Sequence, residues 1–350
     1  MASVYPAFLQ SWRGDSMRGL ITLVLVVSVA WSTWWVVGTT AQKTAIETWM
    51  EQRRDAGWVA EVEEFKVTGY PNRFDSKFTD LTLSNPQAGW IWEAPQFQLL
   101  ALSYKPNHII AVWPGTHSYS TRNDTITITS SQLRGSLIFK PDTALSLDRM
   151  QLETSDLALT GTADWRASAK EASVAFFAHN APDMPPNSYD FYLKALEFSP
   201  PVTWRDSIDK EGVLPETIPE AIFDATLTYD NPWDRFAIEE TNPRMTAIEI
   251  RDLRFLWGAL NLNGKGSIDI SADGYMDGTF TLQAQKWREL LDVIIAAQLL
   301  PPDFSTALDR GVSLVAALAG NPDDIEIKLR FKDRLTYIGA IPIGPAPRIY

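Results

Sequence analysis

Histidine exchanges protons near neutral pH and binds metals, and this chain has three histidines, His108, His117 and His179. His108 and His117 flank residues 112–115, so their two imidazoles could share a proton or a metal ion. The sequence offers no HExxH spacing, no clustered carboxylates and no cysteine to support such a site. We therefore expect structural roles for the histidines and predict no metal site.

Other catalytic motifs are equally weak. The sequence has no GxSxG nucleophile elbow, and the absence of cysteine excludes a thiol nucleophile and a disulfide framework. Residues 264–267 (GKGS) resemble a phosphate-binding loop superficially, but the earlier glycine is missing and a strand pattern follows, so a hairpin turn is the better interpretation. We predict that the protein is not an enzyme and holds no cofactor. A hydrolase that uses His108 or His117 is the third hypothesis.

Tryptophan is abundant in the chain, which contains 14 of these residues. Indole rings usually fill a core because each buries a large apolar surface. The alternative is an apolar groove, because a site for acyl chains needs a continuous apolar concavity. The candidate groove residues are Trp90, Trp92, Trp113, Trp257 and Trp287.

An apolar segment near the N-terminus indicates that the protein is anchored in a membrane. Residues 20–38 carry no charge, and as a helix they approach the ~30 Å hydrocarbon thickness of a bilayer. Trp31, Trp34 and Trp35 gather towards the C-terminal end of this segment, and indole rings prefer the headgroup level of a membrane. We predict a single transmembrane helix over residues 20–38.

Positive charge before this segment predicts its orientation. Arg13 and Arg18 precede it, so residues 1–19 are expected to form a cytoplasmic tail and the body to lie in the periplasm, beyond the inner membrane. A cleaved signal peptide is the alternative, because Thr39 and Ala41 resemble a small-residue cleavage site. The apolar run is, however, longer than the apolar h-region of a usual signal peptide and carries a cluster of tryptophans.

The rest of the chain reads as mainly β with a few helices. Residues 39–57 are predicted to form a stalk helix, either rigid or laid against the body, and residues 58–350 a β-rich periplasmic body. Short alternating segments, such as TITIT at residues 125–129, are separated by turns with Pro, Gly and Asn, which is typical of antiparallel sheets. Proline-rich residues 200–220 mark a candidate junction between two β halves.

Some segments depart from this pattern. The alternation slips between Phe78 and Leu81, which indicates a β-bulge, and slips again at Leu196. Residues 208–222 are expected to contain a short helix, and residues 338–349 an extended Pro-rich tail.

Two amphipathic helices are predicted near the C-terminus. The first covers residues 286–300, where Pro301 and Pro302 end it, and the second runs to about residue 319, before Gly320. They would cover one mouth or face of the sheet, or alternatively act as a gate or a membrane-contacting element.

Three segments resemble the uncharacterised bacterial envelope family called domain of unknown function 2125: residues 69–75 (GYPNRFD), 101–115 (ALSYKPNHIIAVWPG) and 339–347 (GAIPIGPAP). This resemblance implies no activity and no catalytic residues. More distantly, an N-terminal anchor followed by β segments with Gly-x-Gly turns is similar to AsmA-like envelope proteins. That likeness implies an elongated, curved antiparallel sheet that could carry an apolar groove for lipid.

The formal net charge of −12 disfavours nucleic acid as a partner. We predict a membrane-anchored periplasmic protein that binds or passes membrane lipid or another apolar ligand, or that assists envelope assembly. The alternative hypothesis is a non-enzymatic scaffold that docks an envelope protein partner at the inner membrane.

Overall fold

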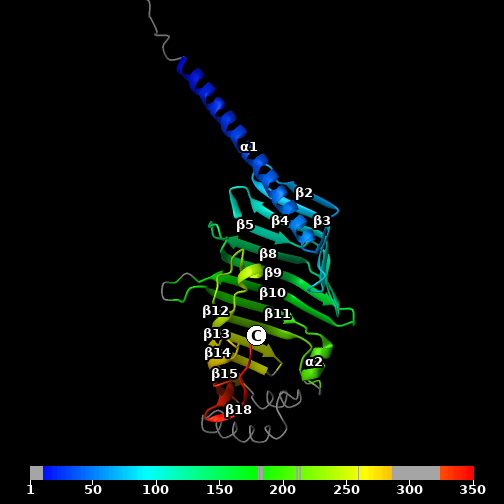
Figure 1. Ribbon diagram of the computed structural model, residues 1–350, viewed down its shortest axis with the longest axis vertical. Helices are drawn as coiled ribbons and strands as arrows, with labels where there is room; N and C mark the ends of the chain where they lie inside the picture. Colours follow the sequence, from blue (N-terminus) through cyan, green and yellow to red (C-terminus); the bar gives the residue numbers. More distant parts are fainter. Residues whose placement is uncertain are drawn as a thin grey trace, which may run out of the picture.

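The computed structural model describes residues 11–179, 181, 184–209, 212, 214–258, 260–285 and 324–350. Within these residues, a long N-terminal helix is followed by one antiparallel sheet, whose strands are stacked along the long axis of the molecule (Figure 1). The predicted class, mainly β behind an N-terminal helix, is confirmed. Most of the predicted tail (residues 1–10), both predicted C-terminal helices and Trp287 lie outside the described residues.

Helix α1 (Ser11–Asp55) is continuous through the segments predicted as a transmembrane helix and a stalk helix. Its part from Met17 to Asp55 is long and apolar enough to cross a membrane, and none of its apolar window is buried. The helix ends just before Gly57, whose φ of +84° is the left-handed conformation that glycine adopts readily after a helix.

The strands have the following bounds: β1 (Val59–Glu61), β2 (Glu64–Thr68), β3 (Arg73–Asn85), β4 (Trp90–Leu102), β5 (Lys105–Val112), β6 (Thr116–Thr121), β7 (Thr125–Thr129), β8 (Gln132–Phe139), β9 (Leu147–Thr160), β10 (Arg166–Ala178), β11 (Ser188–Phe198), β12 (Ile218–Tyr229), β13 (Met245–Trp257), β14 (Leu260–Ile270), β15 (Met276–Gln285), β16 (Asp324–Lys332), β17 (Leu335–Ile338) and β18 (Ile341–Pro345). From β9 to β18 each strand pairs with the next one in sequence. The sheet is therefore a meander of hairpins with local contacts.

The N-terminal part of the sheet is more complex. Strand β3 pairs with both β1 and β2 on one side and with β4 on the other. Strands β5 and β6 pair with opposite ends of β4, and β8 and β7 pair with opposite ends of β9. Because β5 pairs with β8 and β6 with β7, these four short strands act as two long strands, each interrupted in the middle.

A crease of irregular residues crosses several strands at one level. Asp80, Asp156 and Glu197 have left-handed φ values of +48°, +49° and +47° on β3, β9 and β11. Each resets the alternation of side chains within its strand, so that apolar residues three apart share a face. The predicted slip near Phe78 is therefore real. It is not a bulge, however, because the register with β4 is the same on both sides of Asp80.

Two local predictions are corrected. A short helix was predicted within residues 208–222, but helix α2 (Val202–Ile208) ends at residue 208. It begins earlier because Pro201 precedes its first turn, and residues 218–222 already belong to β12. The predicted Pro-rich tail, residues 338–349, is not free of the sheet: residues 341–345 form β18, which pairs with β17, and Arg348 forms a bridge with Tyr275. Pro342 and Pro345 are tolerated in β18 because it forms the edge of the described sheet.

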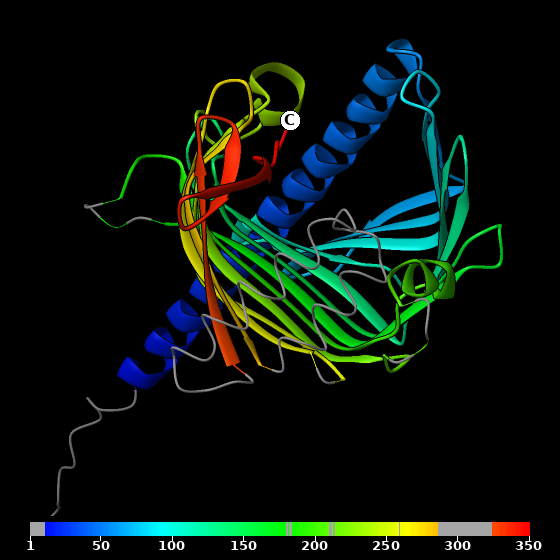
Figure 2. The same cartoon turned by 90° about the horizontal axis from the view of Figure 1, so that it is seen from below.

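The segment near residues 200–220 does not divide the sheet, since β11 before it and β12 after it are hydrogen-bonded neighbours. Figure 2 shows that the sheet is curved and that α1 and the C-terminal end of the chain lie on its hollow side.

The inner face of the sheet as candidate site

Cross-strand pairing aligns apolar side chains on one face of the sheet, because directly paired residues point to the same side. We name this the inner face. Its central row consists of Phe74, Ala101, Ile109, Leu137, Met150, Phe176, Phe191, Ala225, Ile250, Gly266, Phe280, Leu329 and Ile338. The row runs from β3 to β17 without a polar side chain.

A second row lies beside it, two residues along each strand except β13, where an irregularity makes the step from Ile250 to Leu253 three residues. It consists of Val67, Ser76, Leu99, Ala111, Gly135, Leu152, Val174, Leu193, Phe223, Leu253, Gly264, Leu282 and Ile327. Its one polar member is Ser76, whose hydroxyl accepts a 2.8 Å hydrogen bond from Gln42 of α1. The apolar band of the inner face is therefore at least two residues wide.

The outer face has the opposite character. One outer row beside the central row consists, from β9 to β17, of Arg149, Phe177, Asp190, Thr226, Glu249, Ser267, Thr279, Arg330 and Tyr337. Most of these side chains are charged or carry a hydroxyl group, as expected for a solvated face of an antiparallel sheet.

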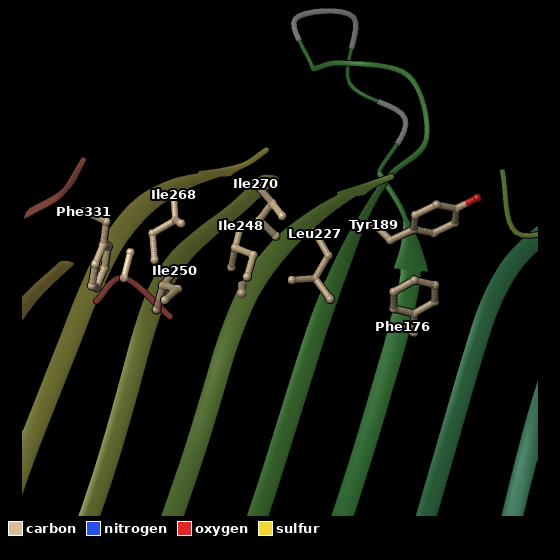
Figure 3. Close-up of a cluster of buried hydrophobic side chains, with 10 residues drawn as sticks. Phe176, Tyr189, Leu227, Ile248, Ile250, Ile268, Ile270 and Phe331 are labelled. Carbon is tan, nitrogen blue, oxygen red and sulfur yellow. The ribbon is translucent and has the colours of Figure 1, made fainter. Parts of the chain in front are cut away.

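The inner face is covered at its two ends. At the N-terminal end, Met50 of α1 is buried against Ala60, Phe78 and Leu81. At the C-terminal end, Ala346 packs into a cluster that includes Ile250 and Phe331 and is shown in Figure 3. Helix α1 and Ala346, which follows the C-terminal hairpin, thus both lie on the apolar side.

The middle of the inner face is less well covered. Val174 and Leu193 of the second row are only half-buried. Leu152, in the same row, is 37% exposed. Leu152 is the one exposed side chain of the two rows, and the half-buried apolar side chains beside it are the part of this face that another apolar group could contact.

The structure distributes the predicted groove tryptophans among different surroundings. Trp92 and Trp113 are linked through Phe97, with ring centroids 5.2 Å and 5.3 Å from it. Trp90 instead meets Trp58 edge to face at 5.2 Å.

Trp257 lies in a different cluster. It is 2% exposed, packs with Leu214, Ile218 and Leu260, and donates a 2.8 Å hydrogen bond to the carbonyl of Pro215. Trp257 therefore fills a core beside α2. Aliphatic and phenylalanine side chains, which were not singled out as site residues, form most of the inner face.

The histidines are far from a shared site. Nε2 of His108 lies 2.9 Å from the hydroxyl of Ser136. His117 is buried opposite Ile128, and burial lowers the pKa of its imidazole. Among the described residues, no group of three or more His, Asp or Glu side chains is placed to hold a metal ion.

The most connected polar group lies on the outer face around Asp190. Nδ1 of His179 is 2.7 Å from its carboxylate, Thr226 donates a 2.9 Å hydrogen bond to it, and Arg251 donates one of 2.6 Å. Burial raises the pKa of Asp190, but these three hydrogen bonds outweigh it, so the net pKa is lowered. Arg251 also bonds Asp224, so the network joins β11, β12 and β13. We interpret it as structural.

Comparison with known proteins identifies the family of the chain. The model of a family described as "Uncharacterized protein conserved in bacteria (DUF2125)" matches residues 35–347, which covers the end of the apolar segment and nearly all of the sheet. No curated protein and no solved structure matches the chain. The likeness to AsmA-like proteins therefore stays a prediction.

Proposed function

The chain belongs to this family of uncharacterised bacterial proteins, and from that premise we propose that it is a single-pass inner-membrane protein whose periplasmic β body binds or passes lipid acyl chains. The observation that carries the proposal is the central row of the inner face. The row crosses from β3 to β17 without a polar side chain, so it forms one continuous apolar surface, which α1 and the C-terminal residues cover in part.

The dimensions of this path suit a chain molecule. At about 4.8 Å per strand, the twelve steps of the central row span roughly 58 Å. Each methylene group that leaves water for such a surface gains about 0.8 kcal/mol. The rows contain no charged side chain that would fix a headgroup, so we expect selection for apolar chains rather than for one headgroup.

The anchor places the body beside a source of such molecules. Helix α1 is long and apolar enough to cross the bilayer, and the preceding Arg13 and Arg18 favour a cytoplasmic N-terminus. In this arrangement the sheet stands in the periplasm with its apolar side next to α1. The proposal assigns the protein no catalytic step.

Photocrosslinking in living cells tests this function. A photoreactive phenylalanine analogue replaces Leu193, on the inner face of β11, or Tyr192, its outer-face neighbour on the same strand. Both positions are about 29 Å, or six strand spacings, from the central-row residue of β3, so contact of α1 with the bilayer does not explain a crosslink. We expect lipid adducts by mass spectrometry from position 193 and few from position 192.

Two results of this crosslinking experiment would contradict the proposal. Absence of lipid adducts at both positions, or equal labelling of the two faces, would refute the acyl-chain site. Stoichiometric capture of one envelope protein without lipid would instead favour the scaffold hypothesis.

A further inference from the structure

The membrane-spanning apolar segment of helix α1 overlaps with the part of the helix that contacts the body. Its apolar segment extends to Val37, yet contacts with the body already begin at Trp31. The indole N–H of Trp31 donates a 2.9 Å hydrogen bond to the carbonyl of Pro71, and that of Trp35 donates a 2.8 Å bond to the carbonyl of Arg73. At 1.5 Å per residue, the overlap is about 10 Å long.

The contacting parts of the body are the tips of two hairpins. The β2–β3 tip, residues 69–72, holds Tyr70, whose hydroxyl lies 2.9 Å from that of Ser32. The β4–β5 tip contributes Ser103, whose carbonyl accepts a 3.4 Å hydrogen bond from Trp34. Both tips therefore lie level with the apolar segment of α1, not beyond it.

The exposed side chains on these tips suit the boundary between lipid and water. Tyr70 is 60% exposed and Tyr104 is 57% exposed. Tyrosine and tryptophan concentrate at the headgroup level of membranes because each combines an apolar ring with a polar group. Arg73 and Lys105 flank the tips, and residues 69–73 and 102–109 contain no acidic side chain that anionic lipid would repel.

We propose that the β2–β3 and β4–β5 hairpin tips form a second membrane contact, inserted among the headgroups of the phospholipid leaflet from which α1 emerges. This inference rests on the proposed membrane anchor and extends the proposed function. Phe74 and Ala101, the first residues of the central row, directly follow and precede these tips. The apolar inner face then begins beside the membrane surface, where α1 covers its first residue, Phe74.

Labelling of single cysteines tests the contact, since the natural chain has no cysteine. Full-length Tyr104→Cys, Val27→Cys and Ile341→Cys variants carry an environment-sensitive fluorophore in liposomes of phosphatidylethanolamine and phosphatidylglycerol. Spin-labelled lipids serve as quenchers. Val27 reports the anchor, and Ile341, 65% exposed on the edge hairpin, is the matched control far from the membrane.

We expect strong quenching at position 27, quenching at position 104 that is greatest with a headgroup-proximal spin label, and none at position 341. If position 27 is quenched but position 104 is no more quenched than position 341, the hairpin contact is overturned, whereas the anchor and the acyl-chain site remain intact. Absence of quenching at position 27 would overturn both the anchor and the contact.

Discussion

Helix α1 crosses Phe74 at Gly38, where a Cβ atom added to the glycine would lie 2.3 Å from Cζ of the phenylalanine ring. Phe74 is 5% exposed and begins the central row of the inner face. The absence of a side chain at residue 38 therefore allows the helix to lie directly on the first residue of the apolar path.

Replacement of Gly38 should loosen this contact. Gly38→Val forces the Phe74 ring out of its place, and overpacking of this kind costs about 1–3 kcal/mol. We expect faster proteolysis near residues 55–58, between α1 and β1, measured on the purified full-length protein. The double variant Gly38→Val with Phe74→Ala should restore much of the protection. An unchanged cleavage rate in the single variant would contradict the close contact.

A charge in the middle of the inner face should reduce lipid binding. Leu152→Lys introduces an ammonium group among half-exposed apolar side chains, and acyl chains would have to desolvate it. We expect the amount of copurified lipid to fall several-fold in native mass spectrometry. Gln151→Lys, on the opposite face of β9, is the matched control and should retain wild-type lipid. Equal loss in both variants would point to misfolding instead.

The sequence predicted the strands better than the site. Alternation within each strand, as in residues 125–129, shows that one face is apolar, but it says nothing of how strands align. The central row arises from the register of hairpins whose turns differ in length. The predicted tryptophans differ in position: Trp113 lies against Gly135 of the second row, whereas Trp257 is enclosed by Leu214 and Leu260.

The phase slips were visible in the sequence, yet their meaning depended on neighbouring strands. Glu197 has a left-handed φ next to the predicted slip at Leu196, and Asp80 lies within the slip between Phe78 and Leu81. Aligned irregularities of this kind can be recognised only after the strands are paired.

The hydrogen bonds to Asp190 should give stability that depends on pH. Its pKa is lowered in the folded protein, so its contribution is present above the ordinary value near 3.9 and is lost as pH falls through the folded pKa. Asp190→Asn should lose about 1–2 kcal/mol in urea unfolding at pH 7, a figure reduced for partial exposure. The difference should shrink towards pH 3. Asp277→Asn, exposed on β15, is the control and should change little at either pH.

His117 should act in a higher pH range. Burial lowers the pKa of its imidazole, and its Nδ1 has no hydrogen-bond partner in the described part of the chain. The unfolded chain therefore binds a proton more readily than the folded protein, so stability should fall as pH decreases below about 6.5. His117→Leu should flatten this dependence between pH 7 and 5 in thermal unfolding. A slope identical to wild type would exclude His117 as its source.

The crease across the sheet leads to a last prediction, at Glu197 on β11, whose φ is +47°. β-Branched residues adopt this conformation at high cost, whereas asparagine tolerates it. We expect Glu197→Val to destabilise the protein by about 2 kcal/mol in urea unfolding. Glu197→Asn should change stability by less than about 0.5 kcal/mol, as is usual for exposed positions. Lys194→Val, at a regular position on the same strand, should likewise be nearly neutral, because β-branched residues suit ordinary strands. Equal effects of valine at residues 194 and 197 would show that the left-handed residue does not determine the crease.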